Sequence, residues 1–193
     1  GNIMAIVLAS QSPRRQELLA RIGVEDFKTL SLDIDESYPE GLSPEDTVRY
    51  IAKKKCDAAA ALCAPDDLII TADTMVFLDN DRLGKPRDEE DALRMLRALS
   101  GRGHTVCTGV SVRRGAQEER FAVSTRVFFR PMTDDEIRAY IKTGEPMDKA
   151  GAYGVQSRGA LFVERIDGDF FNVMGLPVEQ LGLVLARFGV KLL

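Results

Sequence analysis

The sequence is poor in the residues that build zinc and hydrolase sites. Its 193 residues include no tryptophan, one histidine and three cysteines. A lone histidine leaves zinc chemistry and Ser-His-Asp hydrolysis without their usual partners, so we expect His104 to be structural or positioning rather than a general base. Cys56, Cys63 and Cys107 lack CxxC spacing, which favours reduced thiols. Cys107 alternates like a strand residue and is expected to be a buried structural thiol.

Long apolar runs and nucleotide-binding glycine motifs are also missing. No apolar run approaches the roughly 18 residues that span a bilayer. The N-terminus has no basic segment followed by an apolar one, so we expect a cytoplasmic location and no membrane partner. The first three residues, "GNI", are read as an extension or cloning remnant. The absence of GxGxxG and of GxxxxGK[ST] disfavours a dinucleotide-dependent dehydrogenase and excludes a P-loop NTPase.

Charge and composition place the chain among ordinary globular domains. The net charge of -4 argues against a general nucleic-acid binder but leaves room for a local basic pocket that takes a nucleotide-sized anion. Apolar residues make up 45% and charged residues 29% of the chain. This length can hold one domain with a substantial core, and residues 1–193 are expected to form one.

Apolar periodicity predicts a mixture of helices and strands without repeats, and hence an α/β or α+β fold. Helices are expected after Ser12 up to Gly23, and over residues 44–64, 88–101, 133–144 and 178–189. Strands are expected over residues 4–8 and 68–81, as an antiparallel pair within 104–130, and around 161–166.

One helix start carries two cations. Ser12 suits an N-cap and Pro13 the first helical position, yet Arg14 and Arg15 follow at the positive end of the helix dipole. Free N–H groups, serine hydroxyls and guanidinium groups together form a phosphate receptor. The alternative is that both arginines are merely solvated.

Acidic and basic residues elsewhere supply candidates for chemistry. Asp73 interrupts an apolar strand, where a carboxylate is a base, a metal ligand or part of a structural ion pair. Lys85 follows a glycine in a rigid loop and is either near a phosphate or simply exposed. Two further groups are the acidic Asp33, Asp35 and Glu36, and the run Lys53, Lys54 and Lys55, of which at most one can face a given site. The combination suits metal-assisted attack by water on a phosphoanhydride.

The chain resembles the Maf family of nucleotide pyrophosphatases over nearly its whole length. The resemblance rests on "LASQSPRRQELLARIG", "DES", "IAKKKCDAA", "TADTMVFLDNDRLGKPRDEEDALRMLRALSGRGHTVCTGV" and "GEPMDKAGAYGVQSRGALFVERIDGDFFNVMGLPVEQL". It implies a two-lobed, Maf/ITPase-like α/β fold, with a deep central cleft and an elongated mixed sheet flanked by helices. It also implies hydrolysis of a nucleoside triphosphate between its α- and β-phosphates, a divalent cation (Mg²⁺, Mn²⁺ or Co²⁺) and commonly a homodimer.

The resemblance also implies roles for individual residues. Asp73 matches the family's catalytic carboxylate, the proton acceptor for the attacking water. Glu36, Lys55 and Lys85 match polar residues of the same cleft, and Glu36 joins Asp73 as a candidate metal ligand. The phosphate-gripping residues are Ser10, Ser12 and Arg15.

Base preference depends on fewer positions. Family members similar to this chain at Arg14, Thr74 and Gln156 prefer dTTP and UTP, and the amide of Gln156 can pair with a pyrimidine edge. Ser157 and Arg158 follow Gln156, where the family more often has a glycine. Two alternatives stay open: a pyrophosphatase for modified purine triphosphates such as 7-methyl-GTP, and a regulatory septum-formation inhibitor that acts by binding.

Overall fold

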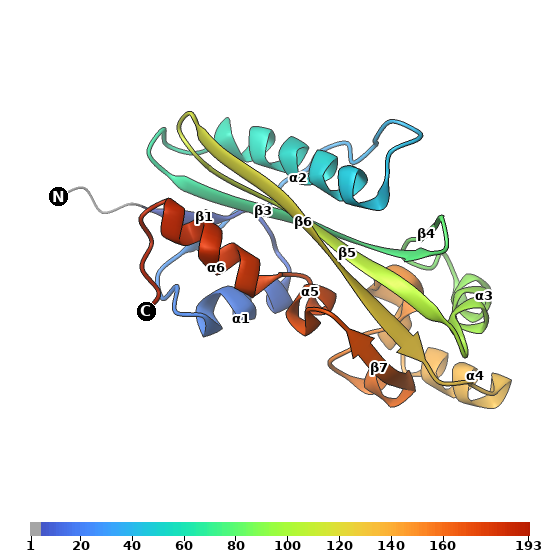
Figure 1. Ribbon diagram of the computed structural model, residues 1–193. Helices are drawn as coiled ribbons and strands as arrows, with labels where there is room; N and C mark the ends of the chain where they lie inside the picture. The colour runs from blue at the N-terminus through green and yellow to red at the C-terminus, as the bar shows by residue number, and fades with distance from the viewer. Residues whose placement is uncertain (1–4) are drawn as a thin grey trace. The chain divides into compact units, whose positions relative to one another are not determined.

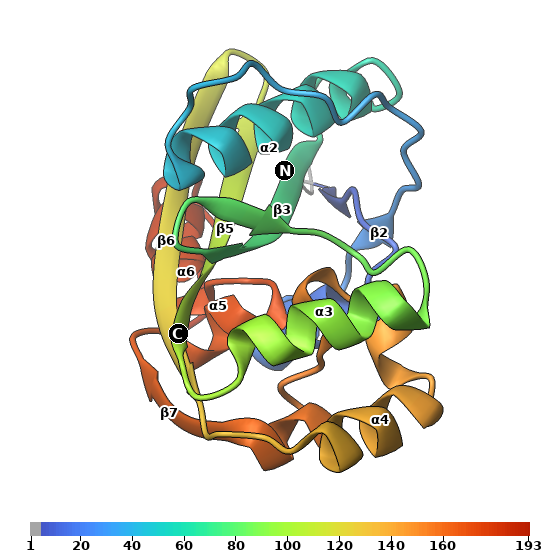
Figure 2. The same cartoon turned by 90° about the vertical axis from the view of Figure 1, so that its right-hand side faces the viewer.

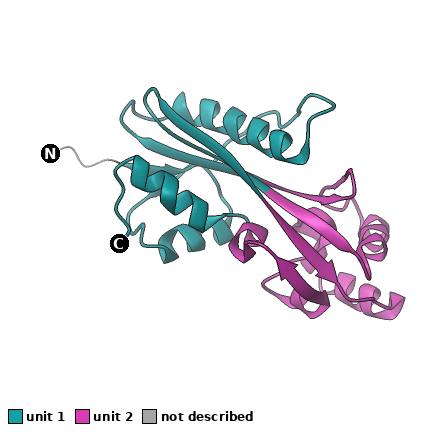
Figure 3. Ribbon diagram, in the orientation of Figure 1, with its two compact units in different colours: residues 1–73, 108–123, 175–193 teal, residues 74–107, 124–174 magenta. Residues whose placement is uncertain are grey.

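The computed structural model describes residues 5–193 (Figure 1). The chain divides into two compact units, each assembled from separate stretches of sequence (Figure 3). The first unit comprises Gly1–Asp73, Thr108–Val123 and Gly175–Leu193, and the second comprises Thr74–Cys107 and Ser124–Met174. The expectation of a single domain with a central cleft stays a prediction.

The strands form one seven-stranded mixed sheet in the order β2-β1-β3-β5-β6-β7, with β4 paired to β3. Their bounds are β1 Ile6–Leu8, β2 Lys28–Thr29, β3 Leu68–Leu78, β4 Asp81–Leu83, β5 Gly103–Arg114, β6 Gln117–Phe129 and β7 Val163–Asp167. Strand β1 is parallel to β2 and β3, whereas β4 and β7 are antiparallel to their partners. Strands β3, β5 and β6 contribute residues to both units.

Helices flank the sheet in the first unit. Helix α2 (Pro44–Ala60) lies on one side of the strands, and α1 (Pro13–Arg21) and α6 (Val178–Arg187) lie on the other (Figures 1 and 2). Each of α1 and α2 begins with a serine cap followed by proline, which satisfies orphan N–H groups and fixes the first φ angle. The apolar faces of these helices are fully buried, at Leu19 in α1 and Ile51 in α2, for example.

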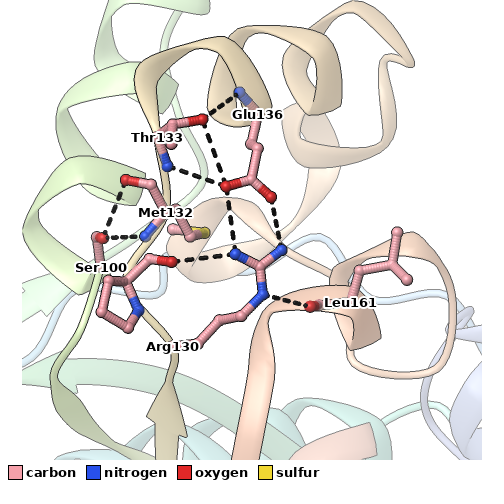
Figure 4. Close-up of polar contacts among 7 residues, drawn as sticks. Ser100, Arg130, Met132, Thr133, Glu136 and Leu161 are labelled. Atoms are coloured by element: carbon pink, nitrogen blue, oxygen red, sulfur yellow. Dashed lines mark hydrogen bonds and ion pairs between the residues drawn. The ribbon is translucent and has the colours of Figure 1, made fainter.

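The second unit holds α3 (Glu89–Leu99), α4 (Asp134–Lys142), the short α5 (Phe170–Met174) and three 3₁₀ helices, Glu145–Asp148, Ala150–Ala152 and Arg158–Phe162. Helix α4 begins with a capping box between Thr133 and Glu136 (Figure 4). Glu136 also pairs with Arg130, whose Nε donates to the carbonyl of Leu161 at 3.1 Å. This network ties the start of α4 to the end of the last 3₁₀ helix.

Most elements match the sequence prediction, and the exceptions are short. The strand expected over residues 68–81 ends at Leu78, and Asp81–Leu83 pairs back on it as β4, with Leu78 opposite Asp81. The strand expected around residues 161–166 begins only at Val163, because Arg158–Phe162 forms a 3₁₀ helix. None of the described helices is long and apolar enough to cross a membrane.

Candidate functional site

The start of α1 carries the predicted phosphate-binding residues. The Oγ of Ser12 accepts a hydrogen bond from the backbone N–H of Arg15 at 3.4 Å, as an N-cap should. One step earlier, the Oγ of Ser10 accepts from the N–H of Ser12 at 3.1 Å. Both hydroxyls therefore lie at the positive end of the helix, and no acidic residue occupies its first turn.

The Arg15 side chain is anchored by a carbonyl from the far end of the chain. Its Nε donates to the oxygen of Gly175 at 2.7 Å, within the first unit. Burial lowers the pKa of Arg15, the charges of Asp73 and Glu36 raise it, and Arg14 lowers it. The guanidinium still carries its charge, so a fixed cation lies within electrostatic range of two carboxylates.

Asp73 is the buried carboxylate of this unit. It lies on β3 between apolar residues and is 8% exposed. Its Oδ1 accepts from the ammonium of Lys55 at 3.1 Å. Its Oδ2 is buried and has no hydrogen-bond partner among residues 5–193. A buried oxygen without a partner is costly, which indicates that Asp73 has a function other than stabilising the fold.

Lys55 joins the two carboxylates. Its Nζ lies 3.4 Å from Oε1 of Glu36 and also donates to the carbonyl oxygen of Ala72 at 3.0 Å. The neighbouring lysines point elsewhere: Lys53 pairs with Asp57 on α2, and Lys54 donates to the carbonyl of Ser37. Helical geometry thus brings one lysine of the run to Asp73, in line with the prediction that at most one can face the site.

The three acidic residues before α2 differ in their contact with the cluster around Asp73. Glu36 reaches Lys55, although its own side chain is mostly exposed. Asp35 instead accepts from the backbone N–H and hydroxyl of Ser37, and these hydrogen bonds lower its pKa. Asp33 is exposed. Only Glu36 of this acidic group is in contact with the cluster around Asp73.

Three candidate residues belong to the second unit. Thr74 directly follows Asp73 on β3, Lys85 is exposed in the loop after β4, and Gln156 is exposed between two 3₁₀ helices. Their membership of one site with Arg15 and Asp73 stays a prediction.

His104 and Cys107 occupy structural positions in the second unit. The Nε2 of His104 lies 2.7 Å from the hydroxyl of Tyr153, and its ring packs edge-on against Phe129. Burial, with a smaller contribution from Arg126, lowers the pKa of His104 to about 4. Cys107 is fully buried on β5. The expected structural role of each residue agrees with this burial.

The donor set around Asp73 fits a small divalent cation. Mg²⁺ and Mn²⁺ prefer carboxylate oxygens and complete their coordination with water and phosphate oxygens. Glu36 and Asp73 supply such oxygens, and the buried Oδ2 of Asp73 lacks a partner in the described chain. Within residues 5–193, no three His, Cys, Asp or Glu side chains group to hold a metal. A cation here would therefore have at most two carboxylate ligands from the described residues and would depend on water and bound phosphate for the rest.

Fold and site define a mixed α/β protein with a charged cluster of arginine, lysine and carboxylates. The family model described as "Maf-like protein" matches residues 5–188. The chain belongs to this family.

Named relatives match the chain over nearly its whole length, and one solved structure matches its fold. A protein of Bacillus velezensis named "dTTP/UTP pyrophosphatase" is 47% identical over 96% of this chain and 97% of its own length. A Dictyoglomus turgidum protein of the same name is 47% identical over 97% of this chain and 98% of its own. The structure of a HAM1 protein from Coxiella burnetii matches the fold with a TM-score of 0.57 at 16% identity, covering 96% of this chain and all of the other.

Sequence reasoning did not identify the backbone groups of the site. The carbonyls of Gly175 and Ala72 hold Arg15 and Lys55, respectively. A carbonyl group leaves no residue-type signal, because every amino acid carries one. Only the folded chain could reveal these contacts.

Proposed function

We propose that the protein hydrolyses the α–β phosphoanhydride of nucleoside triphosphates, dTTP and UTP above all, to the monophosphate and pyrophosphate. The observation that carries this proposal is the state of Asp73, with one oxygen bound to Lys55 and the other buried without a partner in residues 5–193. The names of relatives that cover nearly the whole chain support the same reaction.

Asp73 acts as the proton acceptor. The ion pair with Lys55 fixes the carboxylate through Oδ1, and the carboxylate takes the proton of the attacking water. The water oxygen forms a bond to phosphorus while the bridging P–O bond of the α–β anhydride breaks. Pyrophosphate leaves with the electron pair of that bond.

Cationic groups hold the triphosphate. Ser10, Ser12 and the N-terminus of α1 supply hydrogen-bond donors, and the anchored Arg15 supplies a fixed charge. Lys55 and Lys85 stabilise negative charge that grows on the phosphate oxygens in the transition state. Arg14, Thr74 and Gln156 select the base.

Glu36 and Asp73 would hold a divalent cation, Mg²⁺, Mn²⁺ or Co²⁺, at this site. When bound, such a cation would neutralise phosphate charge and polarise the oxygens of the anhydride. We further propose that the protein works as a homodimer in the cytoplasm and binds no nucleic acid.

The test is a screen for pyrophosphate release from canonical triphosphates and 7-methyl-GTP with each of the three metals. UTP and dTTP are expected to give the highest kcat/KM, and 7-methyl-GTP a lower one. A preference for 7-methyl-GTP would overturn the base assignment, and no release from any triphosphate would favour a binding role.

The same screen includes Asp73→Asn, a nearly isosteric change that removes the proton acceptor. The loss of a general base lowers kcat by a factor on the order of 10² to 10⁴. The melting temperature should stay close to that of the wild type. Retained turnover would show that another group accepts the proton.

A further inference from the structure

The turn that carries Gln156 directly follows a segment of constrained backbone. It lies between the 3₁₀ helices Ala150–Ala152 and Arg158–Phe162. Gly151 has a φ of 71°, and Ala152 follows with a φ of 65°, a conformation that costs energy in a residue with a Cβ. Such strain persists only where surrounding contacts hold the chain in place.

Glu145 supplies contacts on the C-terminal side of this turn. Its two carboxylate oxygens accept the backbone N–H of Arg158 at 3.2 Å and that of Gly159 at 3.0 Å. Burial raises the pKa of Glu145, but hydrogen bonds from Tyr140, Ser157, Gly159 and Arg158 outweigh it and lower the pKa. Glu145 is therefore a carboxylate that collects donors from three consecutive residues.

Tyr140 supplies the contact on the N-terminal side. Its hydroxyl donates to Oε2 of Glu145 and accepts the buried N–H of Gly154 at 3.1 Å. Burial and the hydrogen bond to Glu145 raise the pKa of Tyr140, so the hydroxyl keeps its proton and remains a donor. The Tyr140–Glu145 pair thus holds the chain on both sides of Gln156.

The two sides of the turn pack closely against each other. A Cβ on Gly159 would lie 2.4 Å from the carbonyl oxygen of Gly154, and a Cβ on Gly154 would lie 2.9 Å from the Cε of Lys149. Lys149 in turn donates through Nζ to the backbone oxygen of Glu145 at 3.1 Å. Gln156 is exposed at the tip of this closed turn.

We infer that Tyr140 and Glu145 are positioning residues that set base selectivity through Gln156. This inference rests on the proposed function, in which the amide of Gln156 pairs with the pyrimidine edge. Hydrogen-bonded base recognition needs the amide at a fixed place, because a donor and an acceptor must both meet their partners. Ser157, next to Gln156, adds one more donor to the Glu145 carboxylate.

The decisive measurements are kcat and KM for UTP and ATP in Glu145→Gln and Tyr140→Phe. We expect KM for UTP to rise about tenfold, kcat to change less than about twofold, and the UTP-to-ATP ratio of kcat/KM to fall about tenfold. Asp134→Asn is the matched control, because this carboxylate lies on α4, the helix of Tyr140, but pairs with the exposed Arg97. The UTP-to-ATP ratio of kcat/KM in Asp134→Asn should equal that of the wild type.

A double-mutant cycle shows whether Glu145 acts through Gln156. In a Gln156→Ala background, Glu145→Gln should leave the UTP-to-ATP ratio unchanged, because the group that it positions is gone. Two results would overturn the inference. One is that the effects of Glu145→Gln and Gln156→Ala on the UTP-to-ATP ratio of kcat/KM simply add. The other is that Glu145→Gln lowers kcat equally for all triphosphates and leaves this ratio unchanged.

Amide hydrogen exchange tests whether Glu145 holds the turn, and it needs no measurement of turnover. In Glu145→Gln, exchange of a peptide covering residues 154–160 should accelerate at least about tenfold, while peptides from α3 stay protected. Unchanged exchange would refute the positioning role. If the wild type releases no pyrophosphate from any triphosphate, the proposed function is wrong, and so is the role of Gln156 in base selectivity. The hydrogen-exchange result would still decide whether Glu145 holds the turn.

Discussion

The Nε of Arg15 donates a 2.7 Å hydrogen bond to the carbonyl oxygen of Gly175, a residue 160 positions later in the chain. This contact fixes one edge of the planar guanidinium and orients the rest of it. A guanidinium held in this way can meet two phosphate oxygens with parallel N–H groups. The proposed division of roles assigns the neighbouring Arg14 to the base instead.

Arg15→Lys should therefore weaken triphosphate binding even though it keeps the charge. An ammonium cannot hold Gly175 and present a fork to phosphate at once, so KM is expected to rise about 10- to 100-fold for every triphosphate. Steady-state kinetics with UTP, dTTP, CTP and ATP provide the measurement. Arg14→Ala is the comparison, and it should change the ratios among these substrates. An equal loss for all substrates in Arg14→Ala would assign that residue to phosphate binding.

Lys55→Met should damage both activity and stability. The change leaves the Asp73 carboxylate, 8% exposed, without its cation, and a loss of roughly 1–3 kcal/mol in unfolding free energy is expected. Urea denaturation measures this loss. Lys53→Met is the control, because Lys53 pairs with exposed Asp57 and should cost well under about 1 kcal/mol. The double variant Lys55→Met/Asp73→Asn should recover the unfolding free energy but stay inactive. If the unfolding free energy does not recover, the broken Lys55–Asp73 ion pair is not the cause of the loss in Lys55→Met.

Local signals in the sequence were enough to predict most of the fold. Ser12-Pro13 and Ser43-Pro44 mark helix starts, because hydroxyl caps and a fixed φ angle act within one turn. Helix α5 has no Ser-Pro pair, and its start is capped by Asp169, whose Oδ1 accepts from the backbone N–H of Asn172 at 3.1 Å. It is a short segment whose Asn172 donates to the carbonyl of Val106, 66 residues away. Structure held by distant partners cannot be read from a local pattern.

The candidate site was predictable only where side-chain chemistry is distinctive. Asp73 stands out because a carboxylate inside an apolar strand needs a reason to be there. The choice of Lys55 over Lys53 and Lys54 needs the orientation of α2 against β3, which sequence alone does not supply. Glu145 was not singled out, since an acid after a glycine usually belongs to a solvated turn, and only the folded chain brings Arg158 and Gly159 to it.

Gly109→Ala should displace helix α2 and the lysine that it carries. A Cβ at Gly109 on β5 would lie 2.3 Å from the backbone carbonyl of Val48 on α2, with no flexible side chain to move aside. Overpacking of this kind costs about 1–3 kcal/mol, and kcat should fall as Lys55 shifts from Asp73. Gly182→Ala is the control, because nothing lies within 4 Å of its Cβ and the helix gains about 0.5–1 kcal/mol. A Gly109→Ala protein as stable and active as the wild type would contradict this packing.

The burial of His104 predicts a stability loss in mild acid. Its pKa is lowered from 6.5 to about 4 by burial and by Arg126, so between these values the unfolded chain binds a proton that the folded chain does not. Stability therefore rises with pH through this window and falls as the pH drops from 6.5 toward 4. The neighbouring Tyr153 does not titrate here, because burial raises its pKa far above this range.

His104→Gln removes the titrating group and isolates its contribution. Urea denaturation at pH 7.5, about 5.5 and about 4.5 should show the wild type losing roughly 2–3 kcal/mol more than the variant as the pH falls. The variant starts from lower stability at pH 7.5, because the bond to the Tyr153 hydroxyl and the edge-on contact with Phe129 are disturbed. Parallel pH profiles for the two proteins would mean that His104 titrates normally in the folded state.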